Sequence, residues 1–334
     1  MRKPHAPHRP ALNAGLLALG VGGAAVIGLV TWFGARAIGR EVLAAAWVVP
    51  ATLLLHLFQL HLSAVAWRIS VGPPPEARPP GIGRYMLIRW VREAVNSMLP
   101  VAQLGGNLVG IRLLMHRGVP APQAGAGTTI DLTIEALTQF LFTLAGIAAL
   151  AAISPDRSWA PWVEAFVAAT AVALGGFVLA QRAGLMRLVE TLADRLARVI
   201  PALPQGALHG LHAELLRLQK DRTALAKATA LHLLAWMLGI AETWLALAAM
   251  GHPATLAQAL VVDSLGMAAR SAGFVVPGSL GVQEAGFVLA ASLVGQPPEA
   301  AIALSMVKRL RELTVGATGL VAWQWTEGRR LLRL

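Results

Sequence analysis

The residues of this chain that could do chemistry are ionisable side chains set within apolar segments. Asp131 and Glu135 lie four residues apart, so a helix would place them on one face. A second group, Lys308, Arg311 and Glu312, lies in another apolar stretch. Charged side chains inside a membrane cost free energy and usually mark a functional site.

These residues fall within two segments that repeat along the chain at an offset of 177 residues. The equivalent pairs are Pro100 with Pro277, Asn107 with Glu284, Asp131 with Lys308, and Glu135 with Glu312. A two-fold arrangement could bring Asp131 and Lys308 together as an ion pair, which would either hold two halves together or line a pathway. A repeated polar segment in a membrane protein indicates a transport pathway between two related halves.

The composition indicates an integral membrane protein. Of 334 residues, 56% are hydrophobic and 13% are charged, and the mean hydropathy is +0.61. A soluble domain carries roughly 25% charged residues. The chain has no cysteine, which excludes disulfides, thiolate nucleophiles and cysteine-ligated metals. The net charge of +11 comes from Lys and Arg beside apolar segments, which favours lipid headgroups over nucleic acid as the partner.

Six segments are long and apolar enough to cross a bilayer, which takes about 20 residues. They are Ala11–Phe33, Leu43–Trp67, Gln123–Ile153, Trp159–Ala180, Leu225–Met250 and Ala300–Trp325. The predicted fold is therefore an all-α integral membrane protein with about six spanning helices.

Two stretches between the spans read as re-entrant helical hairpins, over residues 84–118 and 256–295. Each contains two short helical pieces separated by helix-breaking residues. The predicted turn residues are Pro100, Gly105 and Gly106 in the first hairpin, and Pro277, Gly278 and Gly281 in the second. Such hairpins are tolerated at membrane depth where they are buried in protein or line a watery cavity. The alternative is that each hairpin contains a tilted spanning helix.

The distribution of basic residues predicts the topology. Arg and Lys concentrate in the N-terminal segment, in residues 78–117 and 182–222, and in the C-terminal tail, so both termini are expected in the cytoplasm. The predicted halves are residues 1–153 and 154–334, each with three spans. The second half is then inverted relative to the first.

Residues 182–222 have a different character, because leucines recur there at helical spacing against charged residues. We expect interfacial amphipathic helices on the cytoplasmic leaflet, serving either as a structural linker or as a lipid sensor. His209 and His212 are expected to be solvated.

The chain has no zinc-protease, phosphate-cradling or nucleophile-elbow motif, so neither a metal nor another cofactor is expected. We predict that the protein is not an enzyme. Acid–base chemistry on a lipid by Asp131 and Glu135 remains an open alternative.

Two runs carry a resemblance to a known family: Asn96–Asn107, with the sequence NSMLPVAQLGGN, and Val276–Glu284, with the sequence VPGSLGVQE. Together with Asp131 they resemble the flippase-like membrane domain of lysylphosphatidylglycerol synthases, over essentially the whole chain. Residues 89–97, 268–274 and 307–312 look closest to the hopanoid-biosynthesis-associated branch. The family usually has an acid where this chain has Asn107. The synthase domain of the parent family is absent, so the resemblance does not extend to lipid aminoacylation.

The resemblance implies that the protein moves amphiphilic lipids, hopanoids or phospholipids, in the bacterial inner membrane. The expected polar lining of the pathway is Asn107, Arg112, Asp131, Glu135, Glu284, Lys308, Arg311 and Glu312. Alternatives are a non-transporting accessory protein that binds lipid-biosynthesis enzymes and, less favoured, an intramembrane lipid-modifying enzyme.

Overall fold

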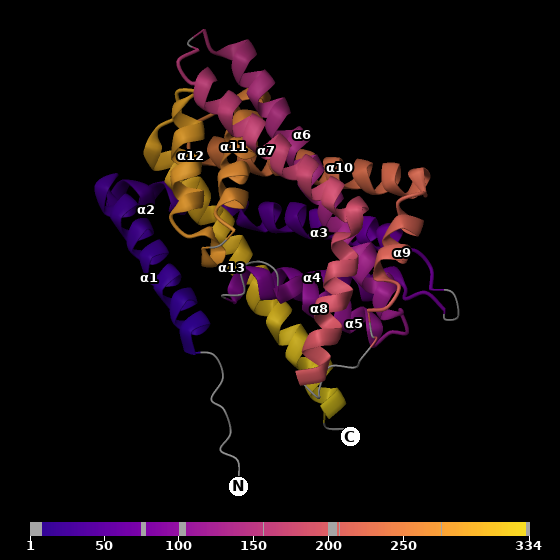
Figure 1. The fold of residues 1–334 in the computed structure, drawn as a ribbon. Helices are drawn as coiled ribbons and strands as arrows, with labels where there is room; N and C mark the ends of the chain where they lie inside the picture. The colour runs from indigo at the N-terminus through magenta and orange to yellow at the C-terminus, as the bar shows by residue number, and fades with distance from the viewer. Residues whose placement is uncertain are drawn as a thin grey trace. The chain divides into compact units, whose positions relative to one another are not determined.

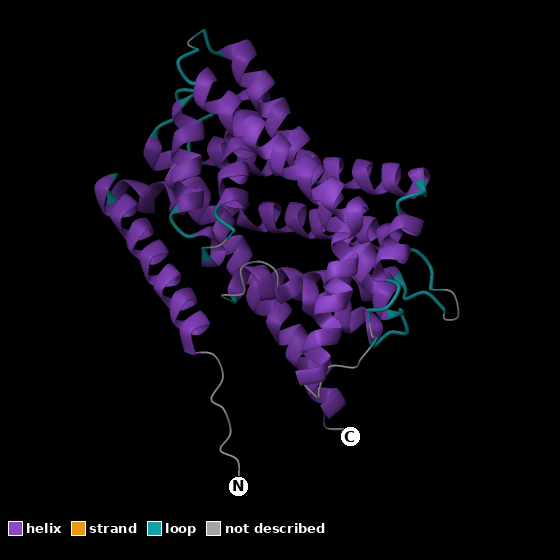
Figure 2. Cartoon of the chain, viewed as in Figure 1, coloured by secondary structure: helices purple, strands orange, loops and turns teal. Residues whose placement is uncertain are grey.

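The structure is a computed structural model that describes residues 9–74, 78–99, 105–155, 157–199, 206, 208–274 and 276–331. Its described elements are helices joined by short loops (Figures 1 and 2). Most of the predicted segment ends are close to those observed. The predicted segment Trp159–Ala180, for example, is the helix Ala160–Ala180.

The first half of the chain contains α1 (Arg9–Trp32), α2 (Ala35–Ala44), α3 (Val49–Val71), α4 (Ile82–Met98), α5 (Gly105–Met115) and α6 (Ala121–Ile153). The second half contains α7 (Ala160–Ala180), α8 (Met186–Val199), α9 (Leu211–Leu218), α10 (Arg222–Ala249), α11 (Leu256–Ala272), α12 (Val282–Ser292) and α13 (Pro298–Leu331). Three short helical turns complete the series: η1 (Ala46–Val48), η2 (Gln181–Leu185) and η3 (Pro277–Ser279).

Four stretches of the described residues are long and apolar enough to span a membrane: Ala46–Val71, Ala121–Ile153, Ala160–Arg195 and Arg222–Ala249. The predicted count of six is thus not reached on these criteria. In α1 the apolar stretch among the described residues is Gly23–Trp32, and α13 is long but carries four charged residues between positions 308 and 312.

The order of the helices repeats along the chain. Shifting α5 by 177 residues gives Val282–Ser292, the bounds of α12, and the same shift moves the start of α6 to Pro298, the start of α13. The starts of α1, α2, α3 and α4 likewise fall within four residues of those of α8, α9, α10 and α11. The helix α7 lies between these two series.

The chain divides into two compact units that interleave in sequence. The first comprises Met1–Thr52, Val91–Gly106 and Glu242–Leu334, and the second comprises Leu53–Trp90 and Asn107–Ala241. Each unit therefore joins the first two helices of one series to the last three of the other. The packing follows the same scheme, because α2 contacts α13 in the first unit and α9 contacts α6 in the second.

The first unit is built around the helical hairpin of α11 and α12. Gly266 lies against the ring of Phe287, and Gly286 lies against Ala269, so the two helices run antiparallel and in close contact. Side chains larger than hydrogen at these glycines would overlap with the neighbouring helix. At the far end, a capping box between Thr255 and Gln258 begins α11.

The turn of the first predicted hairpin is only partly described. Pro100, one of its predicted turn residues, lies outside the described residues. Gly105 and Gly106 begin α5, and the Gly106 N–H donates to Asn96 Oδ1 at 2.8 Å. A Cβ at Gly106 would lie 2.1 Å from the Arg92 carbonyl oxygen, so this position requires glycine.

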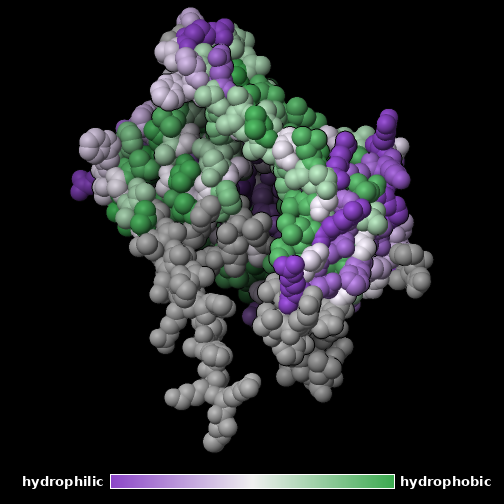
Figure 3. Space-filling view, in the orientation of Figure 1, coloured by the Kyte–Doolittle hydropathy of each residue, from purple (hydrophilic) through white to green (hydrophobic). Residues whose placement is uncertain are grey.

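The second unit packs α6 against α3 and α9. Gly127 of α6 lies against Val71, and the Trp67 indole N–H donates to Thr128 Oγ1 at 3.1 Å. In contrast, α7 has no buried residue, and apolar surface follows most of this helix in Figure 3. A helix that is apolar and uncovered along its whole length is suited to contact with lipid.

Candidate functional site

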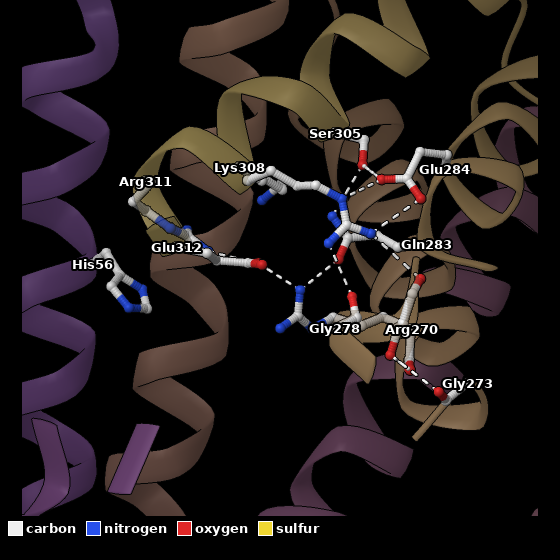
Figure 4. Close-up of polar contacts among 12 residues, drawn as sticks. His56, Arg270, Gly273, Gly278, Gln283, Glu284, Ser305, Lys308, Arg311 and Glu312 are labelled. Carbon is white, nitrogen blue, oxygen red and sulfur yellow. Dashed lines mark hydrogen bonds and ion pairs between the residues drawn. The ribbon is translucent and has the colours of Figure 1, made fainter. Parts of the chain in front are cut away.

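The first candidate site lies where α13 meets the hairpin of α11 and α12 (Figure 4). Ser305, Lys308, Arg309 and Glu312 follow the spacing i, i+3, i+4, i+7, so they share one face of α13. We call the ion-paired residues of this region the α13 cluster. They are Glu242, Asp263, Arg270, Glu284, Lys308, Arg309, Arg311 and Glu312.

Glu284 connects the hairpin turn to α13. Its side chain is fully buried, and its carboxylate accepts from Arg309 Nε at 2.5 Å and from Arg309 Nη2 at 3.1 Å. The same carboxylate accepts from the Gly281 N–H at 2.7 Å and from Ser305 Oγ at 3.1 Å. Glu284 thus caps the start of α12 and forms a two-pronged ion pair with α13.

The turn itself has a backbone that favours glycine. The φ angles of Gly278, Ser279 and Gly281 are 60°, 50° and 80°. Ser279 is the only non-glycine residue with a positive φ among the described residues. Arg309 stabilises the turn, because its Nη1 donates to the Gly278 carbonyl oxygen at 2.9 Å. The predicted break at Pro277 and Gly278 is confirmed, since α11 ends before it and α12 begins after it.

A second layer of the cluster joins α11 to α13. Arg270 Nη1 donates to Glu312 Oε1 at 2.5 Å and also to Gln283 Oε1, and Gln283 Nε2 in turn donates to Ser305 Oγ at 2.9 Å. The side chains of Arg270 and Glu312 are 18% and 13% exposed, so this layer reaches the surface of the unit.

The third layer lies deeper. Lys308 Nζ is 2.9 Å from Asp263 Oδ1 and 3.7 Å from Glu242 Oε2, and Thr243 Oγ1 donates to Asp263 at 2.8 Å. Arg311 also pairs with Glu242. Lys308, Asp263 and Glu242 are each at most 2% exposed.

The α13 cluster is electrically balanced, with four cations against four anions. Balance matters because a buried charge without a partner is strongly destabilising. An α13 carrying these residues is therefore compatible with an apolar environment only while the hairpin supplies their partners.

The second candidate site lies in the second unit and centres on Asp131. Asp131 is fully buried, and its carboxylate is 3.0 Å from both Arg89 Nη1 and His232 Nε2. Arg89 Nη2 also pairs with Glu135 at 3.0 Å. We call Arg89, Asp131, Glu135 and His232 the Asp131 cluster. The side chain of Glu135 is 33% exposed and is the member of the cluster that reaches furthest towards the surface.

The predicted site residues fall in different surroundings. Glu284, Lys308, Arg311 and Glu312 lie together in the α13 cluster, and Asp131 and Glu135 lie together in the Asp131 cluster. The equivalent residues Asp131 and Lys308 each have partners within their own unit. Of the remaining two, Asn107 is buried on α5, whereas Arg112 on the same helix is exposed.

The sequence analysis missed His232 and Glu242 as site residues. Both lie on α10, within the predicted span Leu225–Met250, and both are at most 2% exposed. An ionisable residue inside an apolar span is itself a signal of function. That signal could have identified both residues, although not their partners.

The described residues include no group of His, Cys, Asp or Glu side chains that could hold a metal ion. In both clusters, the carboxylates are paired with arginine, lysine or histidine.

Comparison with known proteins supports a membrane role. The model of a protein family described as the lysylphosphatidylglycerol synthase TM region matches residues 15–319, which include both clusters. No curated protein and no solved structure matches the chain significantly. The matched region covers most of the chain, so this protein is a member of the lysylphosphatidylglycerol synthase transmembrane family.

Proposed function

We propose that this protein moves amphiphilic lipids across the bacterial inner membrane. The observation that carries the proposal is the pair of buried charge clusters, centred on equivalent positions of α6 and α13 in a membrane-family fold. Buried charges are costly in a protein surrounded by lipid and are retained mainly where polar groups must pass or bind.

We further propose that the two helix series form an inverted repeat with re-entrant hairpins. A helix of 17 residues such as α11 is about 25 Å long, and one of 11 residues such as α12 is about 16 Å long. The hydrocarbon core is about 30 Å thick, so neither helix crosses it unaided. With both termini cytoplasmic, α3 and α10 cross in opposite directions, as do α6 and α13.

The exposure of the cluster residues suggests a division of labour. A lipid headgroup can contact only polar atoms that reach a surface. Glu135, Arg270 and Glu312 meet that condition, whereas Glu284, Asp131 and Lys308 are buried and ion-paired. We therefore assign headgroup contact to the first three residues and support of the hairpin and the helices to the last three.

The substrate class follows from the resemblance to the hopanoid-associated branch and from the polarity of these residues. A carboxylate and a guanidinium side by side suit headgroups with hydroxyl, amine or phosphate groups. Hopanoids and phospholipids both fit this description, and the apolar body of either would stay in the bilayer.

The test is lipid translocation in proteoliposomes. Fluorescent phospholipid analogues are placed in both leaflets, and dithionite then bleaches those in the outer one. Bleaching beyond the outer-leaflet fraction, absent from protein-free vesicles, supports the proposal. No extra bleaching for phospholipid analogues, and none for a fluorescent hopanoid, contradicts it and favours the accessory role. Mass spectrometry of the same vesicles tests the enzyme alternative, which requires a chemically altered lipid.

A further inference from the structure

The helix α8 continues from the span of α7 through a kink. The segment Ala160–Arg195 is helical and apolar enough to enter a membrane, but Gly184 within η2 has a φ of 113°. This left-handed conformation is open to glycine and breaks the direction of the helix. The segment α8 can therefore leave the line of the span at Gly184.

One face of α8 is bound to the rest of the second unit. Met186 is buried in a core with Leu211 and Leu215 of α9. The acidic residues of α8 point the same way, since Glu190 Oε1 accepts from the His212 N–H at 2.7 Å and Asp194 accepts from His209 Nε2 at 2.8 Å. Both carboxylates are thus engaged within the protein.

The outer face of α8 is apolar and uncovered. Leu188, Val189 and Leu192 share one side of the helix and are 55%, 37% and 46% exposed. On α9, by contrast, Leu211, Leu215 and Leu218 are buried. The expectation that His212 is solvated is wrong, because it is buried along with these leucines.

The exposed charges next to this apolar face are basic. Arg182, Arg187 and Arg195 are exposed, and no ion pair is found for them among the described residues. Arg195 follows Leu188 by seven residues, which is two turns, so it extends the apolar stripe. An arginine in this place can lay its stem on apolar surface while its guanidinium reaches the lipid phosphates.

We propose that α8 lies in the headgroup layer of an anionic leaflet, with Leu188, Val189 and Leu192 inserted and the three arginines bound to lipid phosphates. Charge complementarity favours this partner, because the acids of α8 face α9 and the uncovered side presents apolar and basic groups. An apolar face flanked by arginines is typical of helices that bind anionic membrane surfaces. The inference does not depend on lipid translocation.

The test uses the absence of cysteine from the chain. Leu192→Cys is labelled with an environment-sensitive fluorophore, and the protein is placed in nanodiscs with brominated lipid chains. The matched control is Ala213→Cys, an exposed position on α9. We expect lipid quenching at position 192 that exceeds quenching at position 213, and that increases when phosphatidylglycerol replaces phosphatidylcholine.

Substitution of Arg182, Arg187 and Arg195 by Gln provides the second arm. Each lost charge should lower the ratio of inserted to free α8 in anionic nanodiscs about fivefold, with little effect in neutral ones. Equal quenching at positions 192 and 213 would overturn the proposal. It would also be overturned if position 192 were shielded from lipid but showed energy transfer between two copies of the chain, because a protein would then cover the face.

Discussion

Removal of the Glu284 carboxylate should destabilise the fold as well as any transport activity. Glu284→Ala leaves Arg309 without its carboxylate partner and leaves the Gly281 N–H at the start of α12 without its acceptor. Loss of one partner of a buried ion pair costs about 3–5 kcal/mol. Loss of the cap costs about 1 kcal/mol more. We therefore expect a decrease of about 4–6 kcal/mol in the free energy of unfolding.

The measurement is reversible unfolding in mixed micelles with increasing SDS, followed by fluorescence of the ten tryptophans. The control is Glu164→Ala on α7, because Glu164 is exposed and has no ion pair in the described structure. Arg309→Ala and the double variant complete a cycle, in which the double variant should be less destabilised than the sum of the two single variants. Additive effects within about 0.5 kcal/mol would refute the reasoning, because residues that do not interact behave in that way.

Two further perturbations test the packing and the second cluster. Gly286→Ala would place a Cβ 2.3 Å from that of Ala269 and should cost about 1–3 kcal/mol of unfolding free energy, whereas Gly175→Ala on α7 has open space and should be neutral or stabilising. Equal effects in the SDS titration would contradict the close contact of α11 with α12. Asp131→Ala removes the acceptor of both Arg89 and His232 and should cost about 3–5 kcal/mol, against about 1 kcal/mol for Asp221→Ala, which removes only an exposed bond to the Ala224 N–H. A loss at Asp131 no larger than that at Asp221 would show that the Asp131 cluster does not stabilise the fold.

Much of the helix pattern could be predicted because local chemistry determines it. The prolines at 120 and 122 set the start of α6, and Pro298 sets that of α13. The offset between the repeated segments likewise carried over from single residues to whole helices, as the match of α5 with α12 shows. Segment ends were less secure: the predicted span Leu43–Trp67 contains the end of α2, the turn η1 and most of α3.

The partners of the charged residues could not be predicted. Asp131 and His232 lie 101 residues apart, and their contact depends on how α6 and α10 are rotated when they pack. Arg309, in contrast, was within reach of the sequence, because it shares a helical face with Ser305, Lys308 and Glu312. The exposure of α8 and the burial of α9 also depend on tertiary packing, since both show the same amphipathic spacing.

The central claim is that lipid headgroups contact the partly exposed members of the two clusters. The most direct test is the rate of lipid translocation in proteoliposomes for Glu135→Gln and Arg270→Gln, beside the exposed control Arg182→Gln, with unfolding measured on the same samples. We expect the first two rates to drop about tenfold or more, because a hydrogen bond to a charged group is worth roughly 1.5–3 kcal/mol, and the control rate to change little. Translocation at the wild-type rate in both Glu135→Gln and Arg270→Gln would contradict the account.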